Sequence, residues 1–237
     1  MKYDLSICMP AYRTDRWESL YESAKEAVGP YTWEMVLVGP NDPPPSLAKK
    51  TNFKFFKDYG TPSRCGQIAT MLSEGELMVH GSDDGTYIKD SLRECIAMHK
   101  DLGHKDFSYW KAWTHPDLRL PGVPKDAFIG LVTMHNLEYF RSLGGWDCRF
   151  EHLNMNLHDL HLRAQRDGAK FYYSPGIVLG CEWSWNWPDS APIQAAYKEN
   201  DAPLFTHMYS QPREGSVEID YFNWIKSDSV WKRRFNR

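Results

Sequence analysis

The chain has 237 residues, a formal net charge of −3 at pH 7 and five cysteines. This length fits one large α/β domain or two small ones, and the charge excludes a global electrostatic footprint for nucleic acid. The cysteines are scattered without a CxxC pair, which argues against a zinc ribbon or a disulfide framework. The amino terminus is too polar for a signal peptide and no apolar run could span a bilayer, so we expect a cytoplasmic protein with buried free thiols.

The first half of the sequence alternates predicted strands with predicted helices. Apolar runs predict strands over 3–9, 33–39, 52–58 and 76–82. Apolar residues at helical spacing predict three helices: one capped by Thr14 or Asp15 (Trp17, Leu20, Tyr21, Ala24, Ala27, Val28), one opening at Pro62 (Cys65, Ile68, Ala69, Leu72) and one after the fourth strand (Ile88, Leu92, Cys95, Ile96, Leu102). This alternation predicts a largely parallel sheet covered on both faces.

The second half is less regular. Strands are predicted over 107–115, 127–135 and 169–180, with a proline-rich connection at 116–124 that forms either a lid or a plain loop. Two helices lie between the last two strands: Leu137 to Leu143, closed by Gly144-Gly145, and one that begins near Asn154 or Asn156 and ends at Gly168. From residue 189 onward the pattern predicts no element, so we expect one domain over 1–188 and an extension over 189–237.

Two adjacent carboxylates, Asp83 and Asp84, follow the fourth predicted strand. Ligands of parallel α/β sheets bind beyond the carboxyl ends of the strands. Adjacent carboxylates there can hold a divalent cation, which would bridge the phosphates of a nucleotide. The alternative is an ordinary solvated turn, since Asp and Gly are common turn residues.

A third carboxylate, Asp159, lies on the predicted helix whose buried stripe includes Leu157 and Leu160. It points about 100° away from Leu160, so we expect it at the edge of a cleft, partly desolvated, as a general base requires. The alternative is a surface ion pair between Asp159 and Arg163 at i, i+4 spacing. His158 and His161 could suggest a metal site, but i, i+3 spacing alone is a weak signal, and two solvated histidines are the favoured expectation.

Tryptophans follow the predicted helix from Leu137 to Leu143 and the last predicted strand. Trp146 and Asp147 follow a helix end, and Trp183, Trp185 and Trp187 share one face if that stretch is extended. Indole rings can stack on the C–H faces of sugars, although core packing is the better expectation for any one of them.

In chain order these segments resemble an inverting family 2 glycosyltransferase of the GT-A fold, over roughly residues 3 to 175. The resemblance is carried by "LSICMPAYR", "WEMVLVGPND", "TPSRCGQIATMLSEGELMVHGSDDG", "FRSLGGWD" and "HDLHLRAQRDG". It implies an α/β fold of GT-A type, with a mostly parallel central sheet flanked by helices. A Rossmann-like nucleotide-binding half would span about 1–105 and an acceptor half about 106–188, before the C-terminal extension.

The resemblance also implies residue roles on the donor side. The residues implied to bind the nucleotide sugar are Pro10, Ala11, Tyr12, Arg13, Asn41, Asp42, Arg64, Gln67 and Asp83. Among them Asn41 or Asp42 would read the base and Asp83 would lie on the ribose side. Asp84 would bind Mn²⁺ or Mg²⁺ on the diphosphate of a donor, most simply a UDP or GDP sugar.

On the acceptor side the resemblance implies Trp146, Asp147, His158 and Trp183. Asp159 would be the catalytic base that deprotonates the hydroxyl of a carbohydrate or lipid-linked acceptor. Where the family often has Asp-Asp-Gly-Ser after the second strand, this chain has Gly39-Pro40-Asn41-Asp42, which leaves the base preference open. The residue before the implied base is commonly acidic in the family and is His158 here.

Three alternatives stay open. A non-catalytic protein that keeps the fold and binds a sugar, a nucleotide or another protein is the first, and a nucleotidyltransferase is the second, although "PAYRTDRW" lacks the glycines of such enzymes. The third concerns the tail, where 226–237 mixes aromatic and basic residues. Such a segment can lie on an anionic membrane, but a tail folded on the domain or frayed is the favoured expectation.

Overall fold

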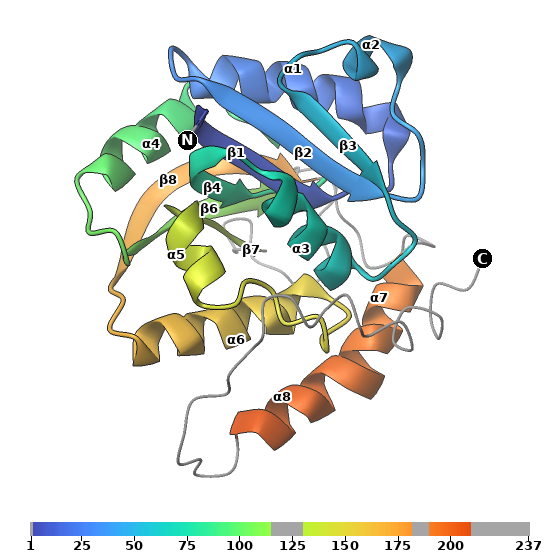
Figure 1. Cartoon of the computed structure of the whole chain (residues 1–237), viewed down its shortest axis with the longest axis vertical. Coiled ribbons are helices and arrows are strands. Elements are labelled where there is room, and N and C mark those ends of the chain that lie inside the picture. Colours follow the sequence, from blue (N-terminus) through green and yellow to red (C-terminus); the bar gives the residue numbers. More distant parts are fainter. Residues whose placement is uncertain (1, 115–129, 182–189, 210–237) are drawn as a thin grey trace.

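The computed structural model describes residues 2–114, 130–181 and 190–209 (Figure 1). The predictions for the proline-rich connection 116–124, for the three tryptophans between 183 and 187 and for the tail 226–237 lie outside the described residues. So does the expected domain boundary near residue 188. Of the described helices, none is both long enough and apolar enough to cross a membrane.

The centre of the molecule is a curled sheet of eight strands in the order β3-β2-β1-β4-β7-β6-β8-β5. The strands are β1 (Tyr3–Pro10), β2 (Trp33–Gly39), β3 (Phe53–Lys57), β4 (Gly75–His80), β5 (Gly85–Tyr87), β6 (Phe107–Thr114), β7 (Gly130–Asn136) and β8 (Phe171–Cys181). β3, β2, β1 and β4 run parallel, as does β8 beside β6. β7 runs antiparallel to both of its neighbours, and β5 antiparallel to β8. The predicted α/β fold is confirmed, and every antiparallel pair includes β7 or β8 from the second half of the chain.

Helices cover both faces of the sheet (Figure 1). The described helices are α1 (Trp17–Val28), α2 (Pro45–Ala48), α3 (Pro62–Leu72), α4 (Ser91–Lys100), α5 (Leu137–Ser142), α6 (Leu153–Arg166), α7 (Ser190–Ala196) and α8 (Ala202–Tyr209), with a π-helical turn at Tyr197–Asp201. α1 and α4 pack on one face and α3, α5 and α6 on the other. The short elements α2 and β5 and the helices after residue 189 were not predicted from the sequence.

Alternate residues of each parallel strand feed the two halves of the core. In β1, Leu5, Ile7 and Met9 join the cluster under α1 and α4, whereas Cys8 joins the cluster under α3, α5 and α6. The six apolar residues predicted for the face of α1 are all buried. Leu72 of α3 is instead 38% exposed, because the helix ends there and the chain turns towards β4.

Ile88 precedes α4 and is exposed, so its predicted place on that helix is wrong. The cysteines are free thiols, four of them buried, as the sequence predicted.

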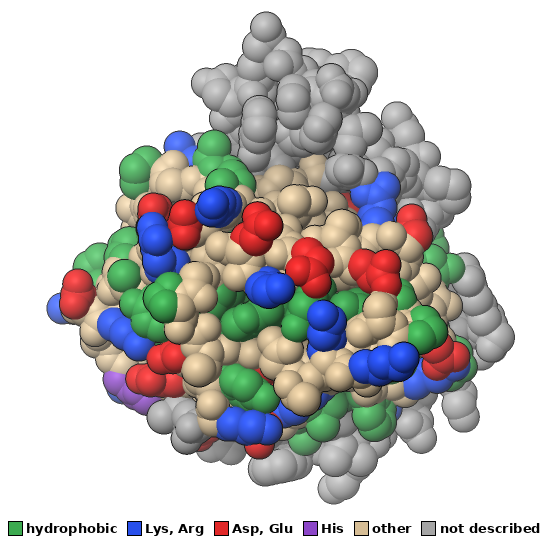
Figure 2. Space-filling view, turned by 90° about the horizontal axis from the view of Figure 1, so that it is seen from above, with side chains coloured by type: hydrophobic (Ala, Val, Ile, Leu, Met, Phe, Trp, Pro, Cys, Tyr) green, Lys and Arg blue, Asp and Glu red, His purple; other side chains and the backbone are tan. Residues whose placement is uncertain are grey.

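On the face that carries α1 and α2, the visible described side chains intersperse Lys and Arg with Asp and Glu (Figure 2).

Candidate active site

Three loops meet where β2, β1 and β4 end. These strands are parallel neighbours, so the segments 11–13, 40–42 and 81–84 leave the sheet along one edge. The first two loops touch closely: a Cβ built on Gly39 would lie 1.7 Å from the carbonyl oxygen of Ala11. Only glycine fits this approach, and Asn41 adds a hydrogen bond of 2.7 Å from Nδ2 to the carbonyl of Tyr12.

Asp83 holds the first loop in place. Its Oδ2 accepts hydrogen bonds from the backbone N–H groups of Tyr12 (2.5 Å) and Arg13 (2.7 Å), and its Oδ1 accepts from Nη1 of Arg13 (2.6 Å). Only 5% of the residue is exposed. Asp83 therefore shapes the loop that was predicted to border a nucleotide, and its predicted ribose contact stays a prediction.

Asp84, unlike Asp83, has a carboxylate oxygen that accepts no hydrogen bond from the described residues. The residue is 3% exposed; Ser82 donates a hydrogen bond to Oδ1, and none of the described residues donates to Oδ2. Burial raises the pKa of Asp84 above its usual value, because the charged form loses its hydration. A buried carboxylate oxygen without a donor suits a cation, which would supply the missing charge.

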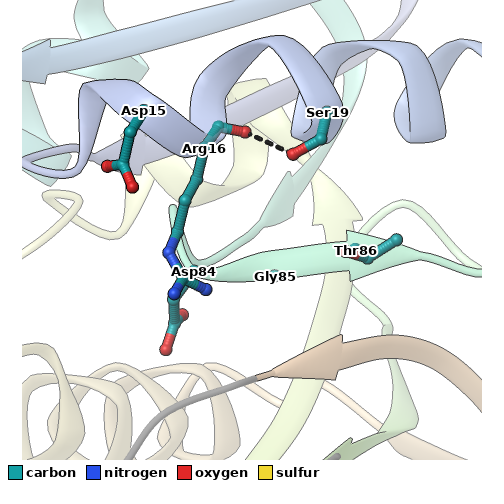
Figure 3. A pocket seen from close by; sticks show the side chains of 6 residues that line it. All are labelled: Asp15, Arg16, Ser19, Asp84, Gly85 and Thr86. Atoms are coloured by element: carbon teal, nitrogen blue, oxygen red, sulfur yellow. Dashed lines mark hydrogen bonds between the residues drawn. The ribbon is translucent and has the colours of Figure 1, made fainter.

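The cation ligands available from the protein are few. Within the described ranges no cluster of three or more His, Cys, Asp or Glu side chains could hold a metal ion. Asp84 borders an open hollow of about 210 Å³, together with Asp15 and Arg16 just before α1, Ser19 in the first turn of α1, and Gly85 and Thr86 of β5 (Figure 3). A cation at Asp84 would therefore need oxygens from a bound ligand, as a diphosphate could provide.

The remaining residues predicted to bind the donor lie at the end of β1, in the loops after β1 and β2, and at the start of α3. Asp42 is exposed and forms an ion pair with Lys57 at 2.8 Å, and Asn41 faces the first loop. Arg64, in the first turn of α3, donates through Nε to both carboxylate oxygens of Asp58 at 3.0 Å. Pro10 closes β1, and Tyr12 in the loop that follows is 39% exposed.

Two predicted binding residues belong to the interior instead. Gln67 is fully buried, and its Oε1 accepts a hydrogen bond of 2.7 Å from the backbone N–H of Trp146. Trp146 is 1% exposed and packs against His80 and Phe140 at ring separations of 5.5 and 5.2 Å. The ring of Trp146 fills the core between β4 and α5, and its acceptor-side role stays a prediction. Gln67 stabilises the turn that carries Trp146 through this hydrogen bond.

Asp159 lies on the middle of α6 and is completely buried, not at a cleft edge as predicted. Its Oδ2 accepts hydrogen bonds from Nε (2.9 Å) and Nη2 (2.7 Å) of Arg163. The i, i+4 ion pair expected as the alternative therefore forms, but inside the protein. On the other side, the hydroxyl of Tyr209 from α8 donates to Oδ1. Burial raises the pKa of Asp159, partly opposed by the charge of Arg163.

Asp147 lies beside this carboxylate in a rigid loop. Its backbone N–H donates to Oδ1 of Asn156 (2.9 Å), whose Nδ2 donates back to the carbonyl of Asp147 (3.0 Å). The Asp147 side chain pairs with Arg149, and its charge acts on Asp159. His158 is exposed on α6, with its ring 6.2 Å from that of Phe205. Trp183 lies outside the described residues.

Two contacts connect the segment before α6 to α3 and to the end of β4. The backbone N–H of Ser63, in the first turn of α3, donates to the carbonyl of Glu151 just before α6 (3.2 Å). His80, the last residue of β4, meets Trp146 from the loop that leads to α6. The start of α6 is thus held near α3. Of the described residues, those that line the hollow at Asp84 lie at 15–19 and in β5, and Asp159 is not among them.

Sequence reasoning missed Tyr209 and Asp201 entirely. Asp201 is completely buried, and its carboxylate accepts hydrogen bonds from the backbone N–H groups of Glu151 and His152, each 2.8 Å long. Neither residue belongs to a periodic pattern, and each lies about 50 positions from its partner in the chain.

Solved structures of S. aureus TarS share this fold. One matches with a TM-score of 0.61 and 15% identity over 77% of this chain, which spans 37% of the TarS chain. TarS 1–349 in complex with UDP matches 89% of this chain (TM-score 0.60, 15% identity, 73% of its own length), and the complex with UDP-GlcNAc matches 79% (0.61, 15%, 61%). No protein-family model and no curated protein sequence matches the chain. The likeness supports the GT-A type of fold that the sequence predicted.

Proposed function

We propose that this protein is a glycosyltransferase that moves a sugar from a nucleoside-diphosphate sugar to an acceptor hydroxyl, with inversion and with a divalent cation. The observation that carries the proposal is the buried Oδ2 of Asp84, which has no donor among the described residues. It lies at the end of the parallel strands, where α/β folds bind nucleotides. The UDP and UDP-GlcNAc complexes of TarS, which has the same fold, favour a UDP sugar as donor.

In this reaction the first loop, held by Asp83, would border the nucleotide. Asp84 would hold Mn²⁺ or Mg²⁺, whose charge would stabilise the departing diphosphate. Asp159 would accept the proton of the acceptor hydroxyl, and its raised pKa makes it a stronger base than a solvated carboxylate. Arg163 would fix the orientation of that carboxylate through two hydrogen bonds. The acceptor we propose is a carbohydrate or a lipid-linked sugar, and the unpaired thiols support a reducing, cytoplasmic location.

A second candidate is a non-catalytic sugar or nucleotide binder with the same fold. It is favoured by one observation: Asp159 is completely buried and both of its oxygens already accept hydrogen bonds. A base in this state cannot meet an acceptor without a rearrangement.

One experiment separates the two candidates. UDP, GDP, CDP and dTDP sugars are screened with Mn²⁺ by thermal shift, and each stabilising donor is then assayed for release of the nucleoside diphosphate with candidate acceptors. Stabilisation by one donor class accompanied by release supports the transferase. Stabilisation without release, across all acceptors, favours the binder, and stabilisation by no donor contradicts both.

A further inference from the structure

The C-terminal helix α8 lies over the carboxylate of Asp159. The ring of Phe205 contacts those of Phe150 (6.5 Å between centroids) and His158 (6.2 Å), and one turn later Tyr209 donates its hydroxyl to Asp159. The guanidinium of Arg166 lies over the Tyr209 ring at 5.4 Å from its centroid, so Tyr209 contacts α6 at two residues, Asp159 and Arg166.

The helix is tethered more firmly at its start than along its length. Asp201, which directly precedes α8, accepts two backbone hydrogen bonds at the start of α6, and Asn200 donates to the carbonyl of Arg149 (3.1 Å). α8 itself meets α6 through the ring of Phe205 on His158 and through Tyr209, which contacts Asp159 and Arg166. Losing the contacts of α8 would therefore leave the Asp201 tether intact, so the helix can swing away about that point.

The contacts of α8 reproduce what an acceptor would have to supply. An acceptor sugar must donate a hydroxyl to the base, and Tyr209 already donates one to Oδ1 of Asp159. The apolar C–H face of a sugar packs well on aromatic rings, and Phe205 already covers Phe150 and His158 in this way. Both sets of contacts cannot exist at once, because Asp159 and Phe150 are each fully buried beneath the helix.

We propose that Phe205 and Tyr209 hold the place of the acceptor, and that α8 is a displaceable cover over Asp159. The ligand that replaces it is a carbohydrate, with one ring face on Phe150 and His158 and one hydroxyl on Asp159. This inference rests on the proposed function for the identity of the ligand, but the cover itself is a property of the protein without any ligand.

The covering of Asp159 by α8 is tested without a nucleotide-sugar donor. Asp159 in the full-length chain is labelled with a water-soluble carbodiimide and glycine ethyl ester, and the modified peptides are quantified by mass spectrometry. Tyr209→Ala should label Asp159 roughly tenfold faster than the unmodified chain, the factor expected when one hydrogen bond to a charged group is lost. Tyr197→Ala, in the same segment but at an exposed position, is the matched control, and exposed Glu138 is the internal reference.

Phe205→Ala provides a second route to the same result if Tyr209→Ala lowers the melting temperature strongly. Labelling of Asp159 at an unchanged rate in both variants overturns the cover, provided their far-UV circular dichroism matches that of the unmodified chain. Faster labelling in Tyr197→Ala as well would overturn it too, since the effect would then not belong to the Asp159 contact.

The acceptor mimicry is tested with UDP-GlcNAc and Mn²⁺. Tyr209→Ala should hydrolyse the donor faster than the unmodified chain, because water reaches Asp159, while its affinity for the donor stays the same. Equal or slower hydrolysis overturns the mimicry, and so does a sugar found covalently on Tyr209 in the unmodified chain, which would make the tyrosine an acceptor itself. If no variant binds any nucleotide sugar, the proposed function fails, and the labelling result still decides the cover.

Discussion

Acid should destabilise this fold through its buried histidines, and His99 gives the clearest case. The residue lies on α4, is 4% exposed, and has Nδ1 3.1 Å from Oγ of Ser108. Burial lowers the pKa of His99 to about 4 from the ordinary value of 6.5, slightly opposed by the charge of Asp106. The folded protein therefore holds a neutral imidazole under conditions where the unfolded chain takes up a proton.

The size of the effect follows from the two pKa values. Because the folded pKa is the lower one, the contribution of His99 is fully present above pH 6.5 and is lost as the pH falls towards 4. The complete loss would be about 3.4 kcal/mol, and at pH 5 about 2 kcal/mol of it is already gone. Burial also lowers the pKa values of His80 and His161 to about 4, so they should add to the loss of stability in acid. Ordinary stabilities of about 5–15 kcal/mol make such a loss easy to measure.

Urea unfolding at pH 7 and pH 5 measures this loss of unfolding free energy. Between the two pH values, the unmodified chain should lose about 2 kcal/mol more of its unfolding free energy than His99→Gln, which cannot titrate. His207→Gln, at an exposed position of α8, should lose as much as the unmodified chain. If His99→Gln and the unmodified chain showed the same loss, the imidazole of His99 would not be the group that takes up the proton.

Three further substitutions test the site. Asp84→Asn should weaken the affinity for the donor roughly tenfold or more in the presence of Mn²⁺ and leave the affinity without metal unchanged, as measured by calorimetry. Equal weakening with and without Mn²⁺ would contradict a cation bound at Asp84. Gly145→Ala should cost about 2 kcal/mol more than Gly168→Ala in urea unfolding. Both glycines have positive φ, but only at Gly145 would the new Cβ lie 2.5 Å from a buried side-chain oxygen; equal costs would refute the close contact. Arg163→Met should cost about 3–5 kcal/mol, because it leaves Asp159 buried without its cation, and a near-neutral result would contradict the buried pair.

The first half of the fold was predictable because its periodicity is strong. The six apolar positions of α1 and the four parallel strands follow from spacing alone, and the strand order placed Asp84 at the edge where the first and second loops also end. β5 and α2 were missed because three or four residues are too few to show a period. The helices after residue 189 were missed because their apolar residues are scattered.

The helix and the ion pair of Asp159 were predictable from the sequence, but the burial of the residue was not. The pattern around Asp159 gave both its helix and its pairing with Arg163, yet spacing could not show that α8 returns to cover the pair. Trp146 illustrates the same limit, since a tryptophan after a helix end can lie in the core or at the surface. Contacts between residues far apart in the chain decided both cases.

The central claim is that the carboxylate of Asp159 is the base for transfer from a donor held at Asp84. The most direct measurement compares turnover and donor affinity of Asp159→Asn and the unmodified chain, with the nucleotide sugar identified by the screen and with Mn²⁺. Turnover should fall by about 10²–10⁴, the usual contribution of a general base, while the dissociation constant of the donor stays unchanged. Near-normal turnover in Asp159→Asn would contradict the claim, because another group would then be accepting the proton.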